Sequence, residues 1–253
     1  MSESSAASAP DPVDRDELRR TVIMTVLTVV AGAVDAITFL TMGRVFAALE
    51  TGNVLFLTFA WAGSGQVSVI RPSVALVTFA AGVAAATFAI RALGARGHRW
   101  FPAALATEGV LLAVGGTLDL LRHGTGSPAH DPDLVALGAV ALAMGVRSAV
   151  VLRVAVPGMP TLLIQMSLVQ LVADVATTPR VPDGVQGQLR RLARTRLTAT
   201  VCGMFAGGTL GTLMAPWGTG RALLVVAAVV LALALSGVHA DPPHHRPTSA
   251  PAS

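Results

Sequence analysis

Residues 21–62 form a nearly unbroken apolar run, TVIMTVLTVVAGAVDAITFLTMGRVFAALETGNVLFLTFAWA, which limits the possible folds more than any other feature. A run of this length belongs in a lipid bilayer, whose hydrocarbon core an α-helix crosses with about 20 apolar residues. One acid, Asp35, lies inside the run, and the polar cluster Glu50–Asn53 follows it. An ionisable group within a membrane segment opposes insertion by about 2.5–3.5 kcal/mol, so it marks a candidate functional site.

The composition of the whole chain also indicates a polytopic membrane protein associated with the lipid bilayer. Of its 253 residues, 53% are hydrophobic and 13% are charged, and the mean hydropathy is +0.67. The arginines are not interleaved with aromatic residues as on a nucleic-acid-binding surface, so we expect no nucleic-acid partner. The single cysteine, Cys202, lies in an apolar segment, which excludes a disulfide framework within the chain and a thiolate metal site.

Eight apolar segments can be marked, and six of them approach the length of a spanning helix. They cover residues 22–42, 45–62, 72–91, 101–121, 134–152, 159–173, 197–215 and 222–238. The second segment is interrupted by the polar cluster at 50–53, and the sixth opens with Met159-Pro160 and contains Gln165 and Gln170. We therefore predict an all-α helical bundle with about six spanning helices and two interrupted or re-entrant segments.

The distribution of arginines favours six crossings over eight, because cytoplasmic loops of membrane proteins collect positive charge. Six crossings place the N-terminal arginines and the basic loops around residues 91–99 and 180–194 on the cytoplasmic side, whereas eight crossings place residues 91–99 outside. Both termini are then cytoplasmic. Residues 1–20 and 240–253 are predicted to be disordered tails, because their composition cannot bury apolar area, and residues 21–239 form the membrane domain.

The two halves of the membrane domain show weak sequence similarity, which indicates an internal repeat. The stretch GAVDAITFLTMGRVFAALETGN from Gly32 aligns with GVRSAVVLRVAVPGMPTLLIQM from Gly145, which matches Asp35 to Ser148. Later in each half, small residues recur four apart and allow close helix approach in lipid: Thr78, Gly82 and Ala86, and Gly203, Gly207 and Gly211. Three crossings per half give the halves, about 21–121 and 133–239, opposite orientations, as in the inverted repeats of many secondary transporters.

Four motifs resemble one known family. They are GAVDAITFL from Gly32, FAALETGN from Phe46, AMGVRSAVVLRVAVP from Ala143 and LVAD from Leu171. Over residues 20–238 the chain resembles the YoaK-like bacterial membrane proteins, which are classed under a domain of unknown function. The resemblance implies an inner-membrane protein of six or seven helices and supplies no activity.

The candidate solute or ion pathway consists of the polar residues inside the apolar segments. They are Asp35, Glu50, Thr51, Gly52, Asn53, Glu108, Arg147, Ser148, Thr161 and Gln165. The chain departs from the pattern of the similar family where Ser148 replaces a common asparagine and where a threonine-rich segment is reduced to Thr161 and Ser167. A polar site is therefore expected to draw mainly on the first half.

Each candidate also has a purely structural interpretation. Asp35 and Arg147 have nearly the same register in matched spans and could form an ion pair between the halves. Glu108 could pair with Arg147 or Arg153, and the cluster at 50–53 could cap a half-helix and satisfy backbone groups that lipid cannot.

Three further charged residues are expected to be solvated at the membrane interface because they lie near segment ends: Asp119, Arg153 and Asp174.

The best-supported function is a small-solute transporter or permease, with proton coupling through an acid as an additional hypothesis. The alternative is a membrane scaffold or regulatory partner whose polar residues only fix helix packing. We expect no enzyme, because the spans contain neither a Ser-His arrangement nor paired aspartates. We expect no metal or other cofactor, since every histidine lies in a loop or tail. The solute and the oligomeric state are left open.

Overall fold

The computed structural model describes residues 12–63, 68–95, 100–124, 133–154, 164–177 and 185–236. Within these ranges the secondary structure is entirely helical, which confirms the predicted all-α class. The α-helices are α1 (Pro12–Thr41), α2 (Glu50–Trp61), α3 (Ile70–Ala95), α4 (Trp100–Gly124), α5 (Leu134–Val154), α6 (Ile164–Thr177), α7 (Val185–Met214) and α8 (Thr219–Ser236), with a 3-10 turn, η1 (Ala215–Trp217), before α8.

Six of these helices are long and apolar enough to cross a membrane. The candidate spans are Thr21–Thr41, Ile70–Gly94, Trp100–Arg122, Leu134–Val154, Arg190–Trp217 and Thr219–Ser236. The other two helices, α2 with 12 residues and α6 with 14, fall short of the length needed. The number of predicted spans and the positions of the two short segments are thereby confirmed.

The first helix begins at Pro12, within the segment 1–20 that the sequence predicts to be a tail. Proline suits the first position of a helix, because its fixed φ is helical and the missing N–H would be unpaired there. Arg19 donates a hydrogen bond of 2.6 Å to the Ser236 carbonyl oxygen and ties α1 to the end of α8. Residues 1–11 and 237–253, which include the rest of both predicted tails, lie outside the described residues.

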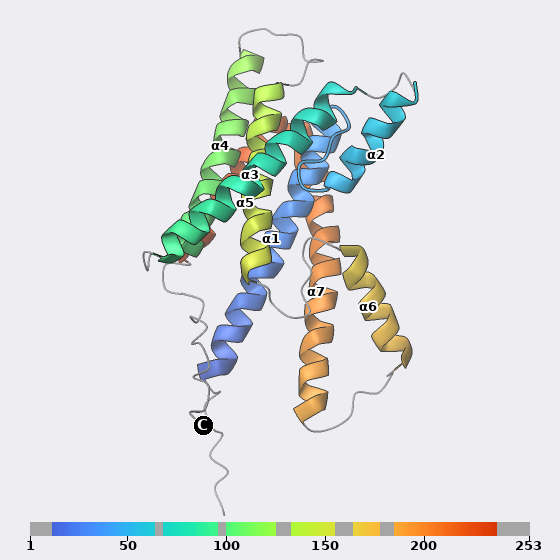
Figure 1. The fold of residues 1–253 in the computed structure, drawn as a ribbon, viewed down its shortest axis with the longest axis vertical. Coiled ribbons are helices and arrows are strands. Elements are labelled where there is room, and N and C mark those ends of the chain that lie inside the picture. Colours follow the sequence, from blue (N-terminus) through green and yellow to red (C-terminus); the bar gives the residue numbers. More distant parts are fainter. Residues whose placement is uncertain are drawn as a thin grey trace, which may run out of the picture.

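The short helices occupy two connections that return to the end of the bundle from which they started. As Figure 1 shows, α1 ends and α3 begins at one end, whereas α5 ends and α7 begins at the other. The direction of α8 agrees, since Gly116 of α4 lies against Gly220, whereas Gly109 lies against Leu231. Helices α4 and α8 are thus antiparallel, as six alternating crossings require. Eight alternating crossings would make them parallel.

The long helices pack in three close pairs, α1 with α7, α3 with α5, and α4 with α8. Glycines lie where the backbones meet: a Cβ atom at Gly32 would lie 2.6 Å from the Met204 carbonyl oxygen, and one at Gly207 would overlap the Val29 carbonyl. The small-residue positions predicted from the sequence are therefore interhelical contacts. Without a hydrophobic effect between helices in lipid, this close packing stabilises the pairs.

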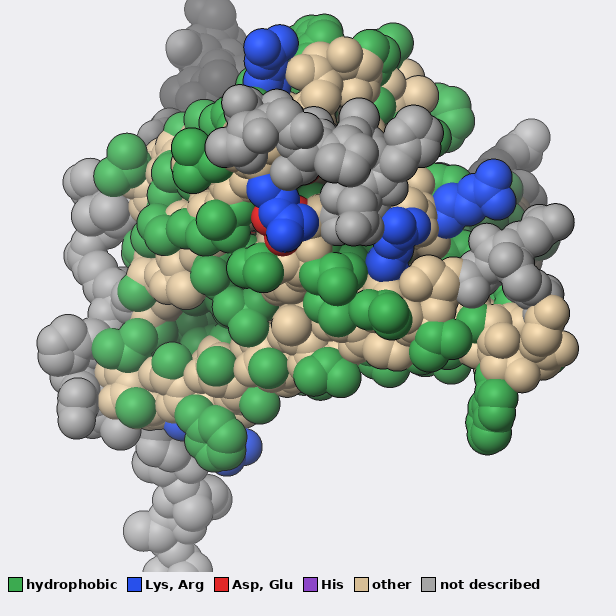
Figure 2. Space-filling model, turned by 90° about the horizontal axis from the view of Figure 1, so that it is seen from above, with side chains coloured by type: hydrophobic (Ala, Val, Ile, Leu, Met, Phe, Trp, Pro, Cys, Tyr) green, Lys and Arg blue, Asp and Glu red, His purple; other side chains and the backbone are tan. Residues whose placement is uncertain are grey.

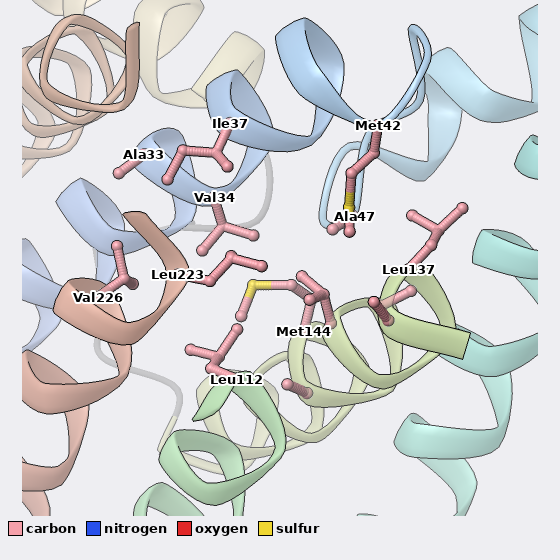
Figure 3. Close-up of a cluster of buried hydrophobic side chains, with 14 of the residues drawn as sticks. Ala33, Val34, Ile37, Met42, Ala47, Leu112, Leu137, Met144, Leu223 and Val226 are labelled. Atoms are coloured by element: carbon pink, nitrogen blue, oxygen red, sulfur yellow. The ribbon is translucent and has the colours of Figure 1, made fainter. Parts of the chain in front are cut away.

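The apolar core consists of two clusters of buried side chains. One contains Val34 and Ile37 of α1, Leu112, Met144 and Leu223, which face one another in Figure 3. The second lies nearer the start of α1 and includes Leu27, Leu105, Val146 and Val150. Thr28 and Glu108 lie between the clusters along the chain, and Arg147 lies three residues after Met144 of the first cluster; all three are buried. A polar layer thus divides the apolar core.

Figure 2 looks onto the end of the molecule at which α1 finishes. Apolar side chains surround a few separated basic side chains on this face, and acidic atoms are visible only beside one basic group. The principal acids of the membrane segments, Asp35 and Glu108, are buried. Their partners must therefore be found inside the bundle.

Candidate functional site

The centre of the polar layer is a buried ion pair between α4 and α5. The Glu108 side chain is fully buried, and its Oε1 atom contacts the Nη2 atom of Arg147, which is 4% exposed. Arg147 also donates a 2.6 Å hydrogen bond from Nη1 to the Leu27 carbonyl oxygen of α1. Of the two arginines that the sequence offered as partners for Glu108, Arg147 and Arg153, the structure pairs it with Arg147.

Among the described residues, two atoms of this pair find no hydrogen-bond partner. They are Glu108 Oε2 and Arg147 Nε, both buried. A buried ion pair recovers its desolvation cost only when the remaining polar atoms are also satisfied. The pair therefore keeps one acceptor and one donor unpaired within the described part of the chain.

Asp35 does not complete this pair, because its carboxylate binds the chain that follows α1. Its Oδ1 atom accepts hydrogen bonds from the backbone N–H groups of Ala47 at 3.0 Å, Ala48 at 2.8 Å and Leu49 at 3.4 Å. These groups lie immediately before α2, close to the positive end of its dipole, where an anion is favoured. The alternative of an Asp35–Arg147 ion pair is therefore not realised: the backbone supplies the donors instead.

Asn53 fixes the same connection from the other side. Its Oδ1 accepts a hydrogen bond from the Phe46 N–H at 3.0 Å, and its Nδ2 donates to the Phe46 carbonyl at 2.7 Å and to Glu50 Oε2 at 2.9 Å. The Phe46 ring also stacks on Phe39 and Phe56. These contacts hold residues 42–49 against α1 and α2.

The polar cluster starts α2 rather than interrupting a longer helix. The break lies earlier, at Gly43 and Arg44, both with positive φ, and Glu50 is the first residue of α2. Gly52 is needed because a Cβ there would lie 2.7 Å from the Phe46 ring, whereas Thr51 is exposed.

Glu50 lies outside the six candidate spans and has one buried oxygen, Oε1, without a hydrogen bond. Burial raises the pKa of Glu50 to about 7, the Asn53 hydrogen bond opposes this rise, and the Asp35 carboxylate adds to it.

A small cavity brings the first-half and second-half candidates together. Its volume is about 50 Å³, and its polar lining comes from Thr28 and Asp35 of α1 and from Arg147 and Ser148 of α5. Leu27, Met144 and Met204 supply much of the apolar wall. This space holds a few water-sized groups and no larger solute. Asp35, Arg147 and Ser148 thus share one cavity, with Glu108 directly behind Arg147.

The polar residues predicted on the second short segment contribute less. Thr161 lies outside the described residues, and Gln165 lies in α6 with its side chain outside them. Ser167 is buried, and its Oγ atom finds no hydrogen-bond partner in the described ranges, whereas Gln170 is exposed. Ser148 donates a hydrogen bond to the Met144 carbonyl at 2.9 Å.

Two acids predicted to be solvated at the interface have structural partners. Asp119 is 4% exposed and accepts a 2.9 Å hydrogen bond from the Gly220 N–H at the start of α8. Asp174 forms ion pairs with Arg190 and Arg194, which fasten α6 to α7. The prediction was wrong for Asp119, because the start of α8 has unpaired N–H groups that this buried acid caps. Asp174 remains partly exposed, as predicted, in addition to its ion pairs. Arg153 is exposed, as predicted.

The sequence interpretation missed Thr28 and the apolar wall of the cavity. Thr28, Ala31 and Asp35 lie three and four positions apart on α1, so they share one helical face with the predicted acid. That spacing could have indicated Thr28. Met204 carried no comparable signal, because only the packing of α7 against α1 brings it to the cavity.

Comparison with known proteins places this chain in a family. A model for a family described as "Protein of unknown function (DUF1275)" matches residues 23–236, almost the entire helical region. The chain belongs to this family. It is 29% identical over 161 residues to UPF0700 transmembrane protein YoaK of Bacillus subtilis (strain 168), covering 62% of this chain and 68% of that protein. No solved structure matches.

These findings confirm the resemblance noted from the motifs, and they identify a membrane protein. They bring no metal or substrate with them. Within the described ranges, no group of three or more His, Cys, Asp or Glu side chains is placed to hold a metal ion.

Proposed function

We propose that the protein is a small-solute transporter or permease of the bacterial inner membrane, with both termini cytoplasmic. The observation that carries the proposal is the small cavity, lined by Asp35, Arg147 and Ser148 inside a bundle of apolar helices. Ionisable groups at such a depth are costly and commonly mark solute or ion pathways. The two unsatisfied atoms of the Glu108–Arg147 pair supply further binding capacity.

The helix crossings support an inverted repeat behind this site. Gly32 of α1 meets the carbonyl of Met204 on α7, and Gly145, its match in the second half, meets the carbonyl of Phe79 on α3. The reciprocal contacts agree, with Gly82 against the Leu142 carbonyl and Gly207 against the Val29 carbonyl: Leu142 and Val29 match in the same register. Transporters with this plan bind solutes where the repeats meet.

In the proposed mechanism the pair α1–α7 moves against the pair α3–α5. The cavity lies between them, since Asp35 and Met204 come from one pair and α5 supplies Met144, Arg147 and Ser148. At about 50 Å³ the cavity is closed to a solute, so entry requires the pairs to separate at one end at a time. The short helices α2 and α6, which we propose to be re-entrant, flank the two ends.

Cysteine accessibility tests this mechanism without knowledge of the solute. In a Cys202→Ala background, a Ser148→Cys variant should react with a small hydrophilic thiol reagent that is added to one side of a proteoliposome. A fraction of the molecules should also react when the reagent is added to the other side. An Ala141→Cys variant is the control, because Ala141 lies on the same helix in the apolar core and is fully buried. Equal protection of both cysteines from both sides would contradict transport.

Solute flux gives the second test. A panel of small neutral, acidic and basic solutes is added to proteoliposomes that contain a pH-sensitive dye, and wild type is compared with Asp35→Asn. We expect at least one chemical class to enter through the wild type and the variant to reduce that flux at least several-fold. Unchanged solute flux in the variant would show that Asp35 is not part of the mechanism. Solute flux without a response of the pH-sensitive dye would show that transport is not coupled to protons.

A membrane scaffold or regulatory partner is the second candidate. It is favoured by the backbone bonds of Asp35 and Asn53, which give both side chains a structural task. If the protein is a scaffold, the cavity should contain no water, and the cysteine of Ser148→Cys should be as protected from the thiol reagent as that of Ala141→Cys. The accessibility experiment therefore separates the two functions.

A further inference from the structure

A second site, unrelated to the central cavity, lies where α3 and α5 end. A hollow of about 210 Å³ is lined there by Thr87, Ile90 and Arg91 of α3 and by Ala149, Leu152 and Arg153 of α5. Because α3 and α5 run in parallel, with Gly138 near Thr78 and Gly145 near Val83, their last turns lie at the same depth. Two arginines thus border one hollow at the edge of the apolar zone.

Neither arginine has an acidic partner within the described part of the chain. Arg91 and Arg153 are both exposed, and the ion pairs of the described residues involve other arginines. Thr87 donates its hydroxyl to the Val83 carbonyl, which leaves its oxygen as an acceptor only. The charge of the hollow is therefore positive and uncompensated.

An apolar groove continues from this hollow along the bundle. It has a volume of about 260 Å³ and shares Ile90 with the hollow, and its wall is built largely from small residues of α3 and α4, including Gly82, Ala85, Ala89, Ala103 and Ala104. Most of α3 faces outward, since only 22% of its span is buried. The groove is therefore open to the acyl chains of the bilayer.

We propose that the hollow and the groove together bind one anionic phospholipid. The phosphate lies between Arg91 and Arg153, and one acyl chain lies in the groove over Ala89 and Ala103. Basic pockets between helix ends suit anionic headgroups, and long arginine side chains reach the headgroup layer from the ends of spans. The proposal is independent of transport, because it uses no residue of the central cavity.

Native mass spectrometry of the full-length protein tests this assignment with phosphatidylglycerol and with phosphatidylcholine of identical acyl chains. We expect one phosphatidylglycerol to remain bound at detergent concentrations that remove phosphatidylcholine. The double variant Arg91→Gln, Arg153→Gln should bind phosphatidylglycerol about 25-fold more weakly, because each basic residue near an anionic lipid contributes about a factor of five. Arg221→Gln, at an exposed arginine of α8, is the matched control and should bind as wild type.

Further variants separate the headgroup from the acyl chain and guard against misfolding. Ala89→Leu fills the groove and should weaken phosphatidylglycerol binding, whereas Ala80→Leu, at an exposed position outside the groove, should not. Arg91→Lys, Arg153→Lys keeps the charge and should keep the preference for phosphatidylglycerol. Equal retention of both lipids, or wild-type binding by the Gln variant, would overturn the proposal. Displacement of the lipid by millimolar inorganic phosphate would instead identify a free-anion site and overturn it equally.

Discussion

At the scale of single residues, the polar side chains of this protein mostly bind backbone groups rather than one another. Asp35 accepts three backbone N–H groups, Asn53 forms two bonds with Phe46, and Asp119 accepts the N–H of Gly220. In a lipid environment every exposed N–H or C=O must find a partner inside the protein. These side chains therefore permit the short helix and the turns to exist within the membrane domain.

The role of Asp35 can be tested with two substitutions. Asp35→Asn keeps an oxygen that can accept from Ala47 and Ala48, so we expect a loss of about 1 kcal/mol in the free energy of unfolding. Asp35→Leu strands these donors and should cost about 3 kcal/mol or more. Unfolding in mixed micelles measures both. If the Leu variant were as stable as the Asn variant, Asp35 would not hold this connection.

The Glu108–Arg147 pair should behave as a coupled unit. Glu108→Leu or Arg147→Met alone leaves the partner as an unpaired buried charge, and we expect each to cost about 3–5 kcal/mol. The double variant Glu108→Leu, Arg147→Met should recover most of this loss, because no charge is then buried. The measurement is a double-mutant cycle on unfolding.

Asp174→Asn is the control for this cycle, since its ion pairs with Arg190 and Arg194 are partly exposed and are expected to contribute at most about 1 kcal/mol. Additive effects of the two buried substitutions would contradict the coupling.

The position of the site was predictable from sequence, but its pairing was not. Asp35 was identified because it is a single acid in an apolar run, and Glu108 and Arg147 were identified as charged residues inside apolar segments. Which acid Arg147 meets depends on helix rotation, since consecutive residues point about 100° apart, and on the depth at which α4 crosses α5. The path of residues 42–49, which supplies the donors for Asp35, is set by tertiary contacts that local sequence does not encode.

At the scale of elements, glycines determine how closely the helix pairs approach. Gly207 and Gly208 are neighbours on α7, but a Cβ at Gly207 would overlap the Val29 carbonyl of α1, whereas a Cβ at Gly208 would meet no atom within 4 Å. This contrast gives an internal control on one helix.

We expect Gly207→Ala to destabilise the protein by about 1–3 kcal/mol, because its methyl group would collide with the Val29 carbonyl. Gly208→Ala should be neutral or stabilising by up to about 1 kcal/mol, because alanine is the better helix former. Thermal unfolding of both variants in one detergent makes the comparison. Equal effects would show that the crossing is looser than the structure indicates.

The helices themselves were largely predictable, because lipid imposes a length and an apolar composition on each span. The residue at which α2 begins was not predictable, because residues 45–49 are as apolar as the helix that follows. Their chain direction is set at Gly43 and Arg44, where positive φ reverses the path. The onset of α1 at Pro12 was also missed, because its first turns are polar and hydropathy reports membrane burial rather than helicity.

At the scale of the whole molecule, the direction of the helices makes a topology prediction. In a Cys202→Ala background, cysteines at Arg44 and Val69 should label from the same side of the membrane, because α2 returns to the end where α1 finished. A cysteine at Ala92, at the far end of α3, should label from the opposite side. Impermeant reagents applied to intact cells and to inverted vesicles make the measurement. Labelling of Arg44→Cys and Val69→Cys from opposite sides would contradict the returning helix.

The two buried acids differ in how soon their partners are synthesised. The first N–H partner of Asp35 follows it by 12 residues, so the acid and its donors leave the ribosome almost together and can enter the translocon as one hairpin. Arg147 follows Glu108 by 39 residues, and α5 must be made before the charge on α4 is neutralised. We therefore expect the insertion of α4 during biogenesis to be assisted by α5, the later segment that neutralises its charge.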